Sequence, residues 1–267
     1  MSQRTLKLHV LGSGSKGNCA VVEAPDGLVM VDAGLSCRET VRRMRAAGLD
    51  EGDVKALVVT HEHSDHVAGV PVWCKRFDGA VLASAGTLEA RQKLAGIRAE
   101  TFRPGDELDV CGMRVRTFAT SHDVVNPVGL RFELQGDAIA IATDTGTLPE
   151  GALAALADAR VLAIECNHDV GMLKRGEYPA YLKARILSDT GHLSNAQAAA
   201  AAADLVTDRT EEVLAMHLSQ DNNRPSLAVR ALAAALEADL LDDVGTRAAR
   251  GGLRIRAAGQ NRPVSAG

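Results

Sequence analysis

Short apolar stretches recur along the whole chain and alternate with segments of helical periodicity. Residues 56–59 and 161–164 have the continuous apolar character of buried strands, whereas residues 35–47 place apolar side chains at helical spacing. Residues 128–134 and 138–142 flank a Gln-Gly-Asp turn and form a predicted hairpin. Because strands, helices and hairpins alternate in this way, the chain is predicted to fold as a layered α/β (α+β) protein.

Composition and length constrain the architecture further. The chain has 267 residues, of which 46% are hydrophobic but only 3% aromatic, so its core is expected to be aliphatic. No linker-like stretch divides the sequence, which favours a single domain over residues 1–267. Residues 260–267 are expected to form a flexible, frayed tail.

Charge and cysteine content favour a cytoplasmic protein without a membrane segment. The formal net charge is −4, which gives no global signal for nucleic-acid binding. Five cysteines, an odd number with no C-x-x-C pair, argue against a disulfide framework. The sequence shows neither a signal peptide nor an apolar run of membrane-spanning length. We therefore expect a protein of the cytoplasm.

The strongest chemical signal is the run His-Glu-His-Ser-Asp-His at residues 61–66, which directly follows a predicted strand. Imidazole and carboxylate groups are ligands for zinc, iron and manganese. In extended backbone, His61 and His63 point to the same side, and Asp65 and His66 lie around the corner, where they can face a second ion. The alternative is a solvated polar loop. The density of ligand types favours two divalent metal ions.

Three further residues of ligand type stand just after predicted strands, namely His122, Asp144 and His217. Each of them taken alone is more often structural than a ligand. Because strand ends gather at one edge of a layered α/β fold, the three together favour a metal site built from separated stretches of chain.

These residues resemble, in sequence order, the five motifs of the metallo-β-lactamase superfamily, with Val-Asp-Ala-Gly at residues 31–34 as the first motif. The resemblance implies a four-layer αβ/βα sandwich with two metal ions at one edge. Ligand chemistry admits Zn²⁺, Mn²⁺ or iron. The implied ligands are His61, His63 and His122 for one ion and Asp65, His66 and His217 for the other, with Asp144 bridging them and Asp32 orienting the ligand loop.

Residues 12–18, 165–169, 191–195 and 217–223 are further similar to the YycJ/WalJ branch of that superfamily, which is related to tRNase Z. Members of this branch act as 5′-to-3′ DNA exonucleases. The resemblance therefore implies a dinuclear phosphodiesterase whose substrate is nucleic acid, with DNA favoured. The chain lacks the long tRNA-gripping arm of tRNase Z and the β-CASP insertion of ribonuclease J, which argues against those activities.

Three residues are predicted to take part in the chemistry. Similarity to tRNase Z implies that Glu165 and His192 relay a proton to the leaving oxygen. Asp65 is expected to accept a proton from the attacking water or to steer it, in competition with its role as a ligand.

Several polar residues near these motifs are candidate substrate contacts. The glycine-rich segment 12–17 matches a dinucleotide fingerprint, but a strand follows it where that fingerprint needs a helix, so a loop near the metals is predicted instead. A tight turn explains this loop equally well, and the histidine at position 168 is alternatively a buried, hydrogen-bonded residue. The candidates are Ser15, Asn18, Asn167, His168, Asn222 and Asn223.

Two groups of basic residues offer a weaker signal for nucleic-acid binding. One lies between residues 165–169 and 191–195, and the other lies in the predicted helix 35–47. Such a group is more often a solvated face than a binding site. The two groups are Lys174, Arg175, Lys183 and Arg185, and Arg38, Arg42, Arg43 and Arg45.

Two other functions remain open from the sequence. A small-molecule hydrolase on the same scaffold would cut a cyclic phosphodiester, a thioester or a lactone. A regulatory protein would keep the fold without the chemistry, but loss of ligands would be expected in that case.

Overall fold

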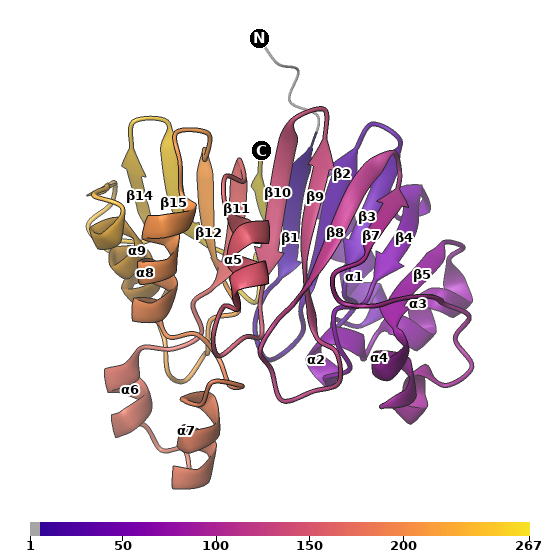
Figure 1. The fold of residues 1–267 in the computed structure, drawn as a ribbon, viewed down its shortest axis with the longest axis horizontal. Coiled ribbons are helices and arrows are strands. Elements are labelled where there is room, and N and C mark those ends of the chain that lie inside the picture. The colour runs from indigo at the N-terminus through magenta and orange to yellow at the C-terminus, as the bar shows by residue number, and fades with distance from the viewer. Residues whose placement is uncertain (1–5) are drawn as a thin grey trace.

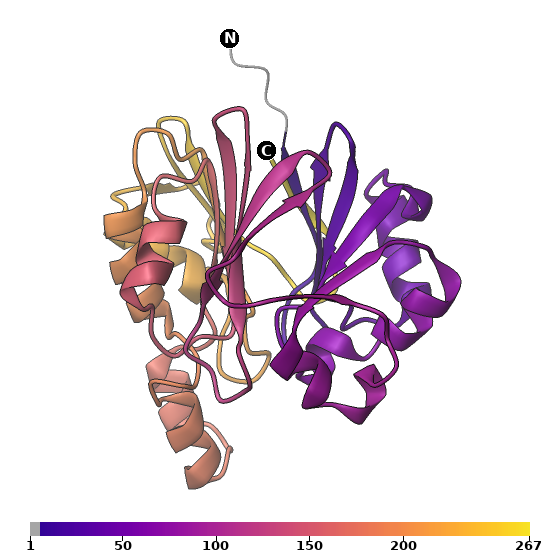
Figure 2. The ribbon, with the colours of Figure 1, turned by 45° about the vertical axis from the view of Figure 1, so that its right-hand side comes forward.

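The computed structural model describes residues 6–267, which form two β-sheets packed face to face with helices on both outer surfaces (Figure 1, Figure 2). The first sheet has seven strands in the order β16-β1-β2-β3-β4-β5-β6. The second sheet has nine strands in the order β13-β14-β15-β12-β11-β10-β9-β8-β7. The predicted four-layer αβ/βα sandwich is confirmed.

The strands and helices have the following bounds. The first sheet contains β1 (Lys7–Gly12), β2 (Cys19–Ala24), β3 (Gly27–Val31), β4 (Val54–Val58), β5 (Ala80–Ser84), β6 (Glu100–Phe102) and β16 (Val264–Ala266). The second contains β7 (Glu107–Val110), β8 (Met113–Ala119), β9 (Val128–Leu134), β10 (Asp137–Ala142), β11 (Val161–Glu165), β12 (Glu212–Met216), β13 (Asp239–Leu240), β14 (Arg247–Arg250) and β15 (Leu253–Ala257). The α-helices are α1 (Cys37–Ala46), α2 (Ser64–Val67), α3 (Val70–Arg76), α4 (Ala85–Glu89), α5 (Glu150–Leu156), α6 (Val170–Arg175), α7 (Ala180–Ile186), α8 (Asn195–Leu205) and α9 (Pro225–Ala235), and short 3-10 helices cover Glu51–Asp53 and Gln92–Leu94.

The central strands are mostly apolar because each sheet lies between two buried clusters. In β11, Val161 and Ala163 face the other sheet, whereas Leu162 and Ile164 pack against α5, α8 and α9. A third cluster joins the outer face of the first sheet to α1 and α3. This burial on both faces explains why the central strands appear as continuous apolar runs in the sequence.

The parallel strands of both sheets end at one edge of the sandwich. Strands β3 and β4 run parallel in the first sheet, and β10, β11 and β12 run parallel in the second. The segments that follow these strands meet at the lower edge in Figure 1, where α2 lies. Helices α6 and α7 extend beyond this edge as an arm (Figure 2).

The carboxyl-terminal segment is ordered, and the expectation of a frayed tail is wrong. Strand β16 returns to the first sheet and pairs with β1, with Ala266 opposite Leu8. The side chain of Gln260 donates to the carbonyl of Gly17 at 2.8 Å and accepts from the amide of Lys16 at 2.9 Å. These contacts join residues more than 240 positions apart, so no local pattern could indicate them.

Arg43 holds this returning segment to the first sheet. Its Nη1 donates to the carbonyls of Leu11 (2.7 Å) and Gln260 (2.6 Å), and its side chain is only 7% exposed. The alternative of a solvated basic face is therefore wrong for Arg43. The same alternative fits Arg42, because its side chain is 62% exposed and pairs with Glu39.

The helices of residues 6–267 are too short to cross a bilayer. The longest, α8 and α9, have 11 residues each, whereas a transmembrane helix needs about 20.

Replacement of Arg43 by Met is expected to lower the free energy of unfolding by roughly 2–4 kcal/mol, because two buried carbonyls lose their donor. Urea denaturation measures this loss. Arg42→Met removes a neighbouring arginine from the same helix and should change the stability by no more than about 0.5 kcal/mol. Equal midpoints for the two variants would contradict the anchoring role of Arg43.

Candidate metal centre

Three residues predicted for the site leave their strands in the left-handed backbone conformation. Asp32 (φ 59°) follows β3, Asp144 (φ 57°) stands two residues after β10, and His217 (φ 52°) follows β12. This conformation costs about 1 kcal/mol or more for a residue other than glycine. Such strain concentrates at functional sites, and here it turns the chain sharply where each strand ends.

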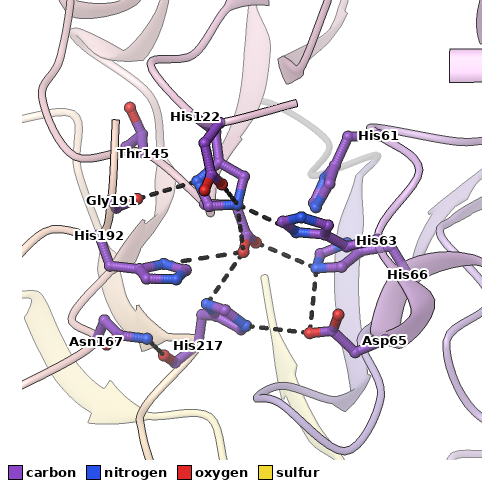
Figure 3. A network of polar contacts seen from close by, with 12 residues as sticks. His61, His63, Asp65, His66, His122, Thr145, Asn167, Gly191, His192 and His217 are labelled. Atoms are coloured by element: carbon purple, nitrogen blue, oxygen red, sulfur yellow. Dashed lines mark hydrogen bonds and ion pairs between the residues drawn. The ribbon is translucent and has the colours of Figure 1, made fainter. Parts of the chain in front are cut away.

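Four predicted ligands form a first group at the edge where the sheets meet (Figure 3). His61 and His63 follow β4, His122 follows β8, and Asp144 follows β10. Each offers one ligand atom, and these atoms lie within 4.8 Å of one another. The Nε2 of His122 is 3.2 Å from the Nδ1 of His63. Three imidazoles and a carboxylate at this spacing suit a divalent metal ion.

Asp65, His66 and His217 form a second group of the same kind. The Oδ2 of Asp65 lies 3.7 Å from the Nε2 of His66 and 3.6 Å from the Nε2 of His217. Asp144 reaches both groups, since its Oδ2 is 3.2 Å from His66 Nε2 and its Oδ1 is 3.8 Å from His122 Nε2. The fold therefore brings all seven predicted ligands together, with Asp144 between the two groups.

The donor atoms fit metal ions. Within the described residues, the Nε2 atoms of His61 and His217 are buried and have no hydrogen-bond partner. An unpaired buried polar atom costs about 1–3 kcal/mol, so two of them in one small site need an explanation. One lies in each group, and a divalent cation in each group would satisfy both.

The charges at the site favour cations. Burial opposes ionisation of Asp144, but His217 and His66 outweigh it and hold the pKa of Asp144 well below its usual range. Burial also opposes protonation of His66, but Asp144 and Asp32 raise its pKa to about 10, so a metal ion bound there would displace a proton from this imidazole. Burial and the neighbouring His66 lower the pKa of His61, which keeps that imidazole neutral, as a metal ligand must be.

Asp32 supports the ligand loop from behind. Its Oδ2 accepts from the Nδ1 of His66 at 2.7 Å and from the hydroxyl of Thr60 at 2.8 Å. Its Oδ1 accepts from the backbone amide of Thr60 at 2.8 Å. Because Asp32 engages the Nδ1 of His66, the Nε2 is the nitrogen turned toward Asp65 and Asp144, which is the geometry expected of an orienting carboxylate.

The loop that carries Asp65 rests against Gly34 and Asn18. A Cβ atom on Gly34 would lie 1.6 Å from the carbonyl oxygen of Asp65, so only glycine permits this approach. The backbone N–H of Asn18 donates to this carbonyl of Asp65 at 2.7 Å. The Nδ2 of Asn18 lies 3.2 Å from Asp65 Oδ2 and 2.9 Å from His66 Nε2. Asn18 thus positions two ligands and does not take the predicted place of a substrate contact.

Glu165, at the end of β11, is fully buried, and its carboxylate accepts four hydrogen bonds. Its Oε1 accepts from the Nδ1 atoms of His192 and His217, both at 2.9 Å. Its Oε2 accepts from the amides of Thr145 (3.0 Å) and Leu193 (3.1 Å). Burial alone would raise the pKa of Glu165, but His192 lowers it by its charge and its hydrogen bond. These contacts hold the imidazoles of His192 and His217 in place, and the proton relay predicted for Glu165 and His192 stays a prediction.

An open cleft of about 320 Å³ lies over the two groups of ligands. Asp65 and His192 line it, as do the predicted substrate contacts Ser15 and Asn167. A larger hollow of about 460 Å³ beside α3 contains no histidine. The chemistry of its lining, and not its size, identifies the smaller cleft as the candidate active site.

The remaining predicted substrate contacts are buried and do not line the cleft, which contradicts their assignment. Asn223 and Asn195 form reciprocal side-chain hydrogen bonds of 2.8 and 2.9 Å. Asn222 is 1% exposed, and its carbonyl accepts from the amide of Asp169. His168 is fully buried, neither ring nitrogen has a hydrogen-bond partner within residues 6–267, and burial lowers its pKa to about 4.

Sequence reasoning missed three residues of one wall of the cleft, Tyr178, Leu182 and Ile186, which lie in and beside α7 with the basic candidate Arg185. The spacing of these residues carries no motif. The positive charge of Arg185 pointed to nucleic-acid binding. The charge alone could not single out Arg185, because the other three basic residues of the segment carry the same charge and do not line the cleft.

Comparison with known proteins agrees with this geometry. The family model described as "Metallo-beta-lactamase superfamily" matches residues 12–217. The chain is 38% identical over 236 residues to "Exodeoxyribonuclease YycJ" of Bacillus anthracis, covering 87% of this chain and 89% of that protein. It is 34% identical over 234 residues to "Exodeoxyribonuclease WalJ" of Streptococcus pneumoniae, covering 85% and 87% respectively.

The fold also resembles a solved structure. The metallo-beta-lactamase fold protein YhfI from Bacillus subtilis superposes with a TM-score of 0.72 at 15% identity. The superposition covers 98% of this chain and 100% of that one. At this level of identity the likeness supports the fold alone.

Replacement of Asp32 by Asn is expected to weaken metal binding by about 10–100-fold, because His66 loses the carboxylate that orients it. Asparagine tolerates the left-handed backbone at this position, so the fold should persist. Competition with a chelator for Zn²⁺ measures the affinity. Asp26→Asn alters an exposed aspartate in the β2–β3 turn and should bind Zn²⁺ like the parent chain. Unchanged affinity in Asp32→Asn would refute the orienting role.

Proposed function

This chain belongs to the metallo-beta-lactamase superfamily, and from that premise we propose that it is a metal-dependent phosphodiesterase that degrades DNA from an end. The observation that carries the proposal is the convergence of two ligand groups on Asp144 beneath an open cleft. The relatives at 38% and 34% identity are named exodeoxyribonucleases and match most of the chain, which supports DNA as the substrate.

Two divalent ions, when bound by the seven ligands, would supply the charge that activates a water molecule and offsets negative charge at phosphorus. We propose Zn²⁺ or Mn²⁺, with iron as the alternative, because the ligands are nitrogen and oxygen atoms. Digestion in the 5′-to-3′ direction is the part of the proposal that rests on resemblance to the YycJ/WalJ branch.

Asp65 and His192 are proposed to handle protons in the cleft. Asp65 lines it, and its side chain remains 22% exposed, so its carboxylate is able to accept a hydrogen bond from an attacking water. The Nδ1 of His192 is engaged by Glu165, which leaves Nε2 as the nitrogen that donates a proton to the departing oxygen. Glu165 keeps the imidazole in place through this hydrogen bond of 2.9 Å.

A small-molecule hydrolase is the alternative function, and the observation that favours it is the volume of the cleft, about 320 Å³, which lies near the lower end of the range for small-ligand sites. The positioned His192 favours phosphodiesters over thioesters, since an alkoxide leaving group needs a proton and a thiolate does not. A non-catalytic regulatory role is disfavoured because all seven ligands are kept.

End-labelled DNA tests the proposal directly. With Mn²⁺ or Zn²⁺, the protein is expected to shorten DNA labelled at one end faster than RNA of the same sequence and faster than a generic carboxylic ester. Asp65→Ala should lose about 10²-fold or more of this activity, because it removes both a ligand and a proton acceptor. Asp26→Asn serves as the control variant. Preference for the ester over DNA would overturn the proposal.

Replacement of His192 by Ala is expected to lower kcat on DNA by about 10²-fold while the metal content stays the same. The loss should be smaller on bis(p-nitrophenyl) phosphate, because p-nitrophenolate departs without a proton. Steady-state kinetics on both substrates and metal analysis of the purified variant provide the measurement. Equal losses on the two substrates would remove His192 from the role of proton donor.

A further inference from the structure

We propose that the arm formed by α6 and α7 (residues 170–190) holds the DNA strand at the cleft, with Arg185 gripping a backbone phosphate and Tyr181 stacking on a base. This inference rests on the proposed function and identifies the surface that a polynucleotide contacts. The arm projects beyond the edge of the sandwich where the metal ligands converge (Figure 1, Figure 2).

The arm is fixed to both sides of the cleft. The hydroxyl of Tyr178 donates to Asp221, in the loop after β12, at 2.7 Å. The guanidinium of Arg185 forms two hydrogen bonds with Asp123, in the loop after β8, at 2.5 and 2.9 Å. The loops that carry His217 and His122 are thereby tied to one element, which forms a wall of the cleft.

Arg185 is the one lysine or arginine among the described residues that line the cleft. Every other ionisable group along that lining is a histidine, a tyrosine or an aspartate. A polynucleotide carries a negative charge on every phosphate, so the phosphates of a strand that extends past the metal ligands are attracted by a positive charge beside them. The side chain of Arg185 is 48% exposed and so is accessible to such a strand.

The contact with Asp123 holds Arg185 in the orientation that a phosphate needs. A carboxylate and a phosphate both accept the paired N–H groups of a guanidinium in the same planar arrangement. An exposed ion pair of this kind adds little to stability, so a phosphate can replace Asp123 at small cost. Asp123 thus acts as the resting partner that keeps Arg185 extended beside the metal ligands.

Tyr181 provides an aromatic surface one helical turn before Arg185. Tyr181 lies in the first turn of α7 and is 76% exposed. Exposed aromatic rings are surfaces on which the bases of single-stranded nucleic acids stack. Both tyrosines of the chain, Tyr178 and Tyr181, lie in the arm. A guanidinium at the cleft with a ring beside it matches what single-stranded nucleic acid requires.

The test compares a polynucleotide with a small diester that has a single phosphate, which is expected to lie at the metal ligands and to leave none for Arg185. Arg185→Ala is expected to weaken binding of a fluorescein-labelled single-stranded oligonucleotide by about 10–100-fold in anisotropy titrations. The slope of log Kd against log salt should fall by about one. The loss in kcat/KM on DNA should exceed the loss on bis(p-nitrophenyl) phosphate by tenfold or more.

Matched variants distinguish loss of the contact between Arg185 and a phosphate from the effects of a lower net charge or of misfolding. Arg42 on α1 is an exposed arginine with the same two-bonded contact to a carboxylate, Glu39, and Arg42→Ala should bind the oligonucleotide like the parent chain. Arg185→Lys should recover only part of the affinity, because an ammonium group lacks the planar fork. Tyr181→Ala should weaken binding about fivefold or more, and Tyr181→Phe should restore it.

The outcomes distinguish this inference from the proposed function. If the parent chain cleaves DNA but Arg185→Ala binds and cleaves it normally, the inference fails and the exonuclease proposal stands. Equal losses on DNA and on the small diester would also overturn the inference, because Arg185 would then act by supporting the cleft. If the parent chain binds the oligonucleotide without cleaving it, the proposed function fails, and the binding data alone decide the role of the arm.

Discussion

The buried carboxylate of Asp144 lies among imidazoles that both sheets supply. Four imidazoles lie within 3.9 Å of its oxygens: His66 from the first sheet and His122, His192 and His217 from the second. A buried charge is tolerated only when opposite charges and hydrogen bonds surround it. The packing of the sandwich must therefore hold these four imidazoles in place, and the geometry of the candidate centre follows from that requirement.

Each sheet supplies one further carboxylate that orients an imidazole toward this point. Asp32 accepts from the Nδ1 of His66, and Glu165 accepts from the Nδ1 of His217. Both carboxylates are buried. The Nε2 of His66 is left beside Asp144 (3.2 Å), and the Nε2 of His217 is left beside Asp65 (3.6 Å). Glu165 also holds His192, so the second sheet positions a ligand and a proton donor through one group.

The sandwich carries the metal ligands, and the arm carries the residues proposed to bind the DNA strand. The ligands stand at the ends of buried strands, where backbone hydrogen bonds and apolar packing fix their positions. The arm is built from two short helices joined to the ligand loops by surface contacts, which suits a surface that must accept a flexible strand. The metal ligands thus lie on the sandwich, whereas the proposed contacts with the DNA strand lie on the arm.

The sequence by itself determined the fold class, the strand ends and the residues of ligand type, because residues 61–66 and the apolar period of the strands are local properties of the chain. Only the tertiary structure decided that Asn18, His168, Asn222 and Asn223 are buried and do not line the cleft, that β16 pairs with β1, and that Arg185 alone among its basic neighbours lines the cleft. Which side of a loop or short helix becomes buried depends on what packs against it, and that partner comes from a distant part of the chain.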